Sequence, residues 1–179
     1  MAADRTAMED TWQAHTDSEF VHPDVDATMA TMTDNPTVLH VPTAMGGRGR
    51  DGVRDFYERW FLGRNPQDFT LRSVSRTVGD DRIVDEMVVS FTHDLDVPWI
   101  LPGVAPTGRP VRIPLVAIVG FRGAAIDSEH IYWDQAAVLA QTLLLDANVV
   151  AHLPVVTEQS DVLEDSPLNM LALLPSERS

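Results

Sequence analysis

The chain has 179 residues, with 27 acidic residues against 13 basic ones, and a formal net charge of −14. This length fits one domain with a hydrophobic core of its own. The charge argues against nucleic acid and anionic membrane surfaces as partners, because both require a positively charged track on the protein. The chain has no cysteine, which excludes disulfides, thiolate nucleophiles and iron–sulfur clusters. It has no lysine either, so Schiff-base chemistry is excluded too.

No apolar run is long enough for a transmembrane helix. The first residues are polar and lack the apolar core of a signal peptide. We therefore expect a cytoplasmic protein.

The first third of the chain predicts three helices. The first covers residues 5–20, with Met8, Trp12 and His15 on one face. The second begins at Pro23 and is expected to end at Asn35-Pro36. The third carries the clearest apolar stripe of the chain, formed by Val53, Phe56, Tyr57, Trp60 and Phe61.

The rest of the chain is dominated by predicted strands. A short strand at residues 37–41 is followed by a flexible loop that contains Gly46, Gly47 and Gly49. From residue 69 the period changes to two, which predicts strands at 69–74, 83–93, 111–121 and 126–134. Residues 97–110 are rich in proline and predict a loop, and residues 138–145 predict a short buried helix.

This order of elements predicts an α+β fold, in which helices pack on one face of a curved, mostly antiparallel sheet. The hollow between sheet and helices is a natural ligand pocket. We assign residues 1–150 to this domain. Residues 151–179 are assigned to a C-terminal tail that serves as a lid or a dimer contact, with one helical turn over residues 168–174.

Several phrases resemble the SnoaL-like branch of the nuclear transport factor 2 superfamily over about residues 8–150. They lie at residues 40–51, 56–57, 76–86 and 91–94. The most specific one, EHIYWDQAAVLAQ at residues 129–141, is also similar to SnoaL-like domains fused to dienelactone hydrolases. The resemblance implies a cone-shaped barrel, usually dimeric, with a deep apolar pocket. The family's enzymes include polyketide cyclases, ketosteroid isomerases and epoxide hydrolases, while other members only bind ligands or partners.

Asp134 matches the aspartate that acts as general acid/base in the polyketide cyclases. A carboxylate in an apolar cone suits proton transfer next to a carbonyl group. The structural alternative is that Asp134 caps the helix that follows it. His130 and Tyr132 share the face of Asp134 on an extended strand. We expect this face to line the pocket, and the face of Glu129, Ile131 and Trp133 to point away.

Other candidates lie on the remaining strands and loops. His40 ends the first strand, where it either contacts a substrate oxygen or has a structural role. His93 lies on the more apolar face of its strand, which is expected to point inward. Glu86 lies on the opposite face and stays a candidate because a β-bulge would exchange the faces; pairing with an arginine is its structural alternative. Trp60 and Trp99 are expected to form apolar walls, and the loop of Trp99 is either a lid or a dimer contact.

Together these residues predict a cofactor-independent acid/base enzyme of the cyclase, isomerase or dehydratase type, acting on a small apolar carbonyl compound such as a polyketide-like metabolite. Asp134, His130 and His40 would be catalytic. The predicted substrate contacts are Tyr132, Trp60, Trp99, His93 and Glu86. No metal is expected, because no closely spaced pair of ligands occurs. The alternatives are a ligand-binding or accessory domain without catalysis and an interaction module; a homodimer is expected.

Overall fold

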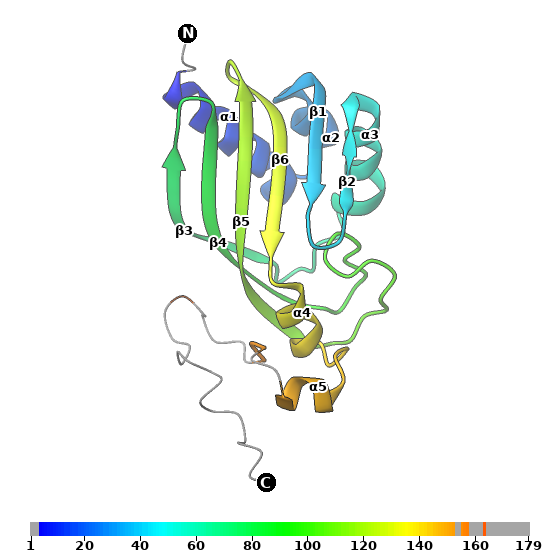
Figure 1. Cartoon of the computed structure of the whole chain (residues 1–179). Coiled ribbons are helices and arrows are strands. Elements are labelled where there is room, and N and C mark those ends of the chain that lie inside the picture. Colours follow the sequence, from blue (N-terminus) through cyan, green and yellow to red (C-terminus); the bar gives the residue numbers. More distant parts are fainter. Residues whose placement is uncertain (1–3, 153–154, 158–162, 164–179) are drawn as a thin grey trace.

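In the computed structural model, the described residues are 4–152, 155–157 and 163. They form one sheet with the N-terminal helices on one of its faces, so the predicted α+β class is confirmed (Figure 1). No helix in these ranges has the length and apolar character needed to cross a membrane.

The first two helices begin where the sequence provides a capping carboxylate. α1 (Arg5–Thr16) starts after Asp4, and α2 (Val25–Ala30) starts after Asp24, whose side chain accepts from the N–H groups of Asp26 and Ala27. The other helical segments are η1 (Asp17–Val21), α3 (Gly49–Phe56), η2 (Tyr57–Phe61), α4 (Gln135–Gln141) and α5 (Ala147–His152). The segments η1 and η2 are π-helical continuations of α1 and α3, so the helices predicted over residues 5–20 and around Val53 to Phe61 are confirmed.

The sheet has the strand order β2-β1-β6-β5-β4-β3. Only β1 and β6 run parallel among its neighbouring strands. The strands are β1 (Met32–His40), β2 (Met45–Arg48), β3 (Thr70–Val78), β4 (Arg82–Thr92), β5 (Pro110–Arg122) and β6 (Ala125–Trp133). The four strands predicted from residue 69 onward are therefore confirmed, with β3 four residues longer at its end than predicted.

The prediction that the second helix continues to Asn35-Pro36 is wrong. The helix α2 ends at Ala30, and Pro36 lies inside strand β1, where the pairing with β6 changes register between Met32 and Thr37. Proline has no backbone N–H to donate, so a strand tolerates it at such an irregularity.

The glycines after this strand form the edge strand β2, and the prediction of a flexible loop is wrong there. Gly46 has a φ of +146°, and a Cβ at this position would collide with the backbone carbonyl of Val38. A Cβ at Gly47 would collide with the backbone of Gly52 at the start of α3. These two glycines therefore allow β1, β2 and α3 to pack closely.

The core lies between the helices and the inner face of the sheet. The helices contribute residues such as Met8, Val53 and Phe56, and the strands contribute Ile83, Val89, Ile113, Ala117 and Val119. Beyond α5, Val155 is buried and Val156 packs against this core. The helical turn predicted over residues 168–174 lies outside the described residues.

Candidate functional site

A cavity lies inside the cone, between α1, η1, η2 and the inner face of the sheet. It has a volume of about 40 Å³, which is room for about three or four water molecules. Its wall is mostly apolar and aromatic, and its polar members are Thr16, Glu19, His40 and Glu129. The apolar part consists of Trp12, Phe20, Phe61, Leu71, Met87, Trp99, Leu115, Ala117 and Ile131.

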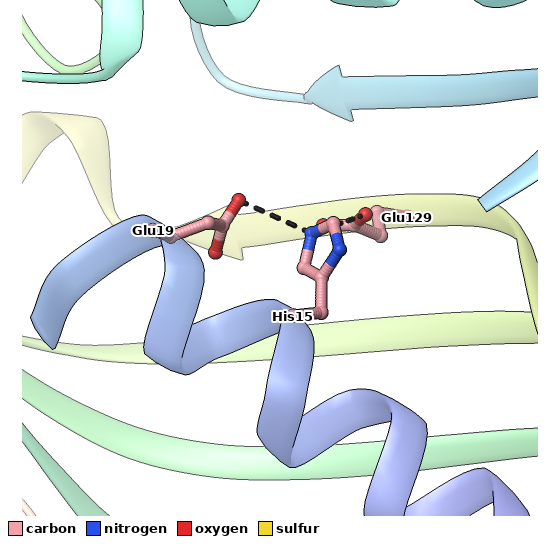
Figure 2. A group of neighbouring side chains, drawn as sticks. All are labelled: His15, Glu19 and Glu129. Atoms are coloured by element: carbon pink, nitrogen blue, oxygen red, sulfur yellow. Dashed lines mark ion pairs between the residues drawn. The ribbon is translucent and has the colours of Figure 1, made fainter. Parts of the chain in front are cut away.

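A buried ionic cluster adjoins this cavity. Figure 2 shows the imidazole of His15, on α1, between the carboxylates of Glu19, on η1, and Glu129, on β6. The Nε2 atom of His15 lies 3.3 Å from Oε1 of Glu19 and 3.1 Å from Oε1 of Glu129. The side chain of His15 is fully buried, and those of Glu19 and Glu129 are only 5% and 3% exposed. Tyr57 on η2 completes the cluster, with its hydroxyl 3.1 Å from the same Nε2.

The orientation of the imidazole is fixed by a chain of hydrogen bonds. The hydroxyl of Thr31 donates to the backbone carbonyl of Thr28 over 2.7 Å. Its oxygen therefore accepts from Nδ1 of His15, also over 2.7 Å. Because Nδ1 donates to Thr31, Nε2 is the nitrogen that faces the carboxylates.

The cluster holds a positive charge on its histidine. Burial by itself lowers the pKa of His15, but the negative charges of Glu129 and Glu19 outweigh it and raise the pKa to about 10. Burial also raises the pKa of Glu19, although the charge of His15 acts against it. Burial, reinforced by the two carboxylates, raises the pKa of Tyr57 well above its usual value, so its hydroxyl stays protonated. The cluster thus contains an imidazolium, a phenol and two carboxyl groups, and burial shifts Glu19 toward its protonated form.

The same three residues are the group that could hold a metal ion among the described residues. One donor atom each from His15, Glu19 and Glu129 lies within 4.8 Å of the others. One imidazole and two carboxylates suit a divalent ion such as Zn²⁺. The imidazolium already places a positive charge between the carboxylates, and this arrangement also accounts for the short distances.

His40 lies at the end of β1 and lines the cavity, as predicted. Its side chain is buried, and Nδ1 has no hydrogen-bond partner among the described residues. Burial lowers its pKa to about 3, against a smaller opposite effect of the Met45 backbone. At neutral pH the ring is therefore uncharged, and it packs against the rings of Phe61 and Trp99 with centroids 5.7 and 5.0 Å apart.

We expect His40 to weaken the fold in acid. Its pKa is about 3 when folded and 6.5 in the absence of burial, so the unfolded chain binds a proton between these values while the folded chain does not. The free energy of unfolding should therefore fall by about 1.4 kcal/mol for each pH unit below 6.5 from this residue alone. Urea denaturation at pH 7, 6 and 5 should show a shallower acid slope in His40→Asn than in the unmodified protein. The same acid slope in both proteins would contradict the lowered pKa of His40 in the folded state.

Trp99 also lines the cavity, as predicted. Its indole N–H donates to Oδ1 of Asn65 over 3.0 Å. Trp133 packs edge-on against it and donates to Gln135 over 2.6 Å, and Gln135 in turn donates to the carbonyl of Ile100. The sequence Trp133-Asp-Gln135 therefore clamps the proline-rich loop onto the end of β6.

The prediction that His130, Tyr132 and Asp134 face the cavity is wrong. In β6 the inner face carries Glu129, Ile131 and Trp133, all buried, while Tyr132 is 40% exposed and Asp134 is exposed. The physical reason is a bulge, since the pairing with β5 changes register after Gly120. Asp134 caps α4 by accepting from the N–H groups of Ala136 and Ala137 at 2.9 and 3.2 Å, so the structural alternative for this residue is confirmed.

Replacing Asp134 with alanine is expected to lower the free energy of unfolding by about 1 kcal/mol, because α4 loses its cap. Asp134→Asn retains a capping oxygen and should cost much less. Chemical denaturation of both variants tests this. An Asp134→Asn variant that keeps its stability but loses chemistry in the cavity would instead revive the catalytic prediction for this residue.

The other three predicted substrate contacts, Trp60, Glu86 and His93, do not line the cavity. Trp60 is 44% exposed and does not line the cavity, because the π-helical turn of η2 directs Phe61 inward in its place. Glu86 lies on the outer face, where it accepts from Ser75 over 3.0 Å. His93 is buried on the inner face, as predicted, but its ring contacts Thr107 at the end of the sheet and lies outside the cavity wall.

Sequence reasoning missed Glu19, Glu129 and Tyr57 as site residues. The available signals were an acidic residue four positions after His15, which shares the buried helix face, and the apolar alternation of Ile131 and Trp133, which places Glu129 on the inner side. Tyr57 was placed in the apolar stripe, and its hydroxyl gave no signal of its own.

The comparisons with known proteins agree with this architecture. Residues 10–128 match the model of the SnoaL-like domain. The chain belongs to this family. No curated protein matches this SnoaL-like chain.

Three solved structures illustrate how far the likeness goes. A proposed SnoaL-like polyketide cyclase from Jannaschia sp. CCS1 has a TM-score of 0.62 at 18% identity, covering 79% of this chain and 94% of its own. A proposed polyketide cyclase from Xanthomonas campestris has a TM-score of 0.59 at 23% identity, covering 77% and 98%. A hypothetical protein with a ketosteroid isomerase-like fold from Catenulispora acidiphila, in complex with trimethylamine, has a TM-score of 0.56 at 17% identity, covering 77% and 95%. At these identities the likeness shows the fold alone. The function of this SnoaL-like protein depends on the side chains of its own site.

Proposed function

We propose that this SnoaL-like protein is an enzyme that moves a proton on a small carbonyl compound bound inside the cone. The observation that carries the proposal is that two buried carboxyl groups, Glu19 and Glu129, border one cavity and share one imidazolium. Two carboxyl groups in unlike environments can serve as an acid and a base at the same pH. The reaction class is isomerisation, dehydration or cyclisation through an enolate.

Glu129 is the proposed base. It lines the cavity, and its Oε1 atom is buried without a hydrogen-bond partner among the described residues. This oxygen therefore has a lone pair for a proton of the substrate. His15 lies 3.1 Å away but is not aligned for a hydrogen bond to it, so the imidazolium stabilises the carboxylate through its charge.

Glu19 is the proposed acid, because burial raises its pKa and favours the protonated form. His40 is proposed to contact the carbonyl oxygen of the substrate, since its neutral ring borders the same cavity. A preplaced donor in a site with little water stabilises a developing enolate more than the same donor would in bulk water. His40 thus keeps the role predicted from the sequence, while Glu129 replaces Asp134 as the base.

The cavity restricts the size of the reacting group. A volume of about 40 Å³ admits only a few non-hydrogen atoms at the carboxylates, so the proposal is for a compact molecule rather than a multi-ring polyketide. The trimethylamine complex of the Catenulispora acidiphila neighbour supports the use of this fold for such small molecules.

Exchange of substrate protons with solvent tests the proposal. The protein is incubated in D₂O with a panel of small ketones and aldehydes, and NMR follows deuterium uptake at the carbon next to the carbonyl group. Saturable uptake above the buffer rate supports proton transfer. Saturable binding of such compounds without any uptake would contradict it and favour a ligand-binding domain that has no catalytic role.

A further inference from the structure

The wall of the cavity carries more carboxyl groups than positive charges. Glu19 and Glu129 both border it, and no arginine is among the described residues that line it. The charge of His15 compensates one carboxylate. The second is neutralised only when a proton or another cation is present, because an uncompensated charge in a buried site is costly.

The nearby guanidinium is already engaged. Arg76 binds Asp85 through two hydrogen bonds of 2.6 and 2.7 Å. Asp85 is itself buried on β4 and also accepts the indole N–H of Trp12 over 2.6 Å. This network is charge-balanced by itself, so Arg76 does not offset the charge of Glu19 and Glu129.

The remainder of the wall is aromatic or aliphatic and offers few donors to an anion. Trp12, Phe20, Phe61 and Trp99 all line the cavity. The indole N–H of Trp12 is bound to Asp85, and that of Trp99 is bound to Asn65. What these rings retain for a ligand is their π-electron surface, which attracts cations.

From these observations we infer that the cavity selects a small organic cation, a tertiary or quaternary alkylammonium group, over neutral and anionic molecules of similar size. The inference rests on the proposed function in one respect, since it names the charge class of the ligand at that site. A methylated ammonium group presents an apolar shell to the rings and a positive charge to Glu129, whose buried Oε1 atom has no hydrogen-bond partner among the described residues. With five non-hydrogen atoms, tetramethylammonium is at the upper limit of what a cavity of about 40 Å³ can hold.

Three probes, each with at least three methyl groups on one central atom, test this on the unmodified protein. Tetramethylammonium chloride carries a permanent charge, tert-butanol is neutral with the same number of non-hydrogen atoms, and pivalate is anionic. NMR follows the indole N–H signals of Trp12 and Trp99, assigned with Trp→Phe variants, during each titration at constant ionic strength. We expect tetramethylammonium to bind with a Kd at least tenfold lower than that of tert-butanol, and pivalate to bind more weakly than both.

Matched variants locate the effect. Glu129→Gln removes the charge with little change in shape, and we expect it to raise the Kd of tetramethylammonium to that of tert-butanol. Glu86→Gln removes an equal charge from the outer face, where Glu86 accepts from Ser75, and we expect it to change nothing. If Glu129→Gln does not fold, the comparison of the three probes on the unmodified protein decides by itself.

Other outcomes overturn the inference. Equal affinities for tetramethylammonium and tert-butanol would show a pocket without charge preference, and tighter pivalate binding would show the opposite preference. Zinc chloride that binds with sensitivity to Glu129→Gln, while tetramethylammonium does not bind, would identify a metal site instead. Binding is measured here without turnover, so a protein that binds the cation but never exchanges protons would leave the inference standing and remove the proposed function.

Discussion

Replacing Glu129 with glutamine is expected to slow proton exchange at the substrate carbon by about 10²–10⁴-fold. The amide keeps the shape of the side chain but cannot accept the proton. Glu19→Gln should have a smaller effect, because its amide still donates a hydrogen bond although it cannot release a proton. The rate of deuterium uptake at saturating substrate is the measurement.

Asp134→Asn is the matched control for this variant. It also neutralises a carboxylate, but Asp134 directly follows β6 and lies outside the cavity. Circular dichroism and thermal unfolding must show that Glu129→Gln is folded before its rate is interpreted. Full exchange activity in a folded Glu129→Gln protein would eliminate Glu129 as the base.

Replacing His15 with glutamine is expected to lower the free energy of unfolding by about 3–5 kcal/mol at pH 7, because the buried carboxylate that the imidazolium compensates loses its positive partner. The folded pKa of His15 is raised to about 10 from 6.5. Its stabilisation is therefore complete below pH 6.5 and is lost as the pH rises through about 10. Urea denaturation of both proteins should accordingly show stabilities that converge at high pH.

A double-mutant cycle separates this effect from loss of packing. In the His15→Gln background one carboxylate is already uncompensated, so removing the charge of Glu129 should cost far less than it does alone, or should restore stability. Additive losses for His15→Gln and Glu129→Gln would show that the two side chains contribute independently and that the ion pair does not hold the cluster together.

The sheet could be predicted from the sequence because the side chains of β5 alternate between buried and more exposed positions, and those of β4 do so except at buried Val88. Of the first strand only the second half, residues 37–41, could be predicted, because Pro36 and the change of register lie inside β1. The strand β2 was missed for a different reason. Its residues Gly46 and Gly47 have no strand preference of their own and are required by close contacts with Val38 and Gly52, which only the folded structure reveals.

The face of β6 shows most clearly where pattern reading fails. The resemblance of Asp134 to the family's aspartate assigns His130, Tyr132 and Asp134 to the inside, which is also the phase of buried Ile126. The bulge near Asp127 changes this phase, and Glu129 takes the inner position. A single irregular residue therefore exchanges the inner and outer faces of β6. This strand also contains the beginning of the most specific sequence phrase that carried the family resemblance.

The ionic cluster could not be predicted because its members lie far apart in the sequence. His15 and Glu19 come from the first helical segments, Tyr57 from η2 and Glu129 from the last strand. Helical spacing places the first two on one face. The distance to Glu129 depends on how α1 crosses the sheet, and no local pattern contains that information.

The position of β6 between β1 and β5 in the sheet has a consequence for synthesis on the ribosome. The hairpin of β1 and β2 and the meander of β3, β4 and β5 emerge first, and neither can join the other until β6 has been made. Until then each part exposes an unpaired strand edge, which favours association with other nascent chains. A polypeptide that ends before residue 125 should thus remain as two unconnected sheet fragments. The ion pair between His15 and Glu129 can form only after β6 has inserted between these fragments.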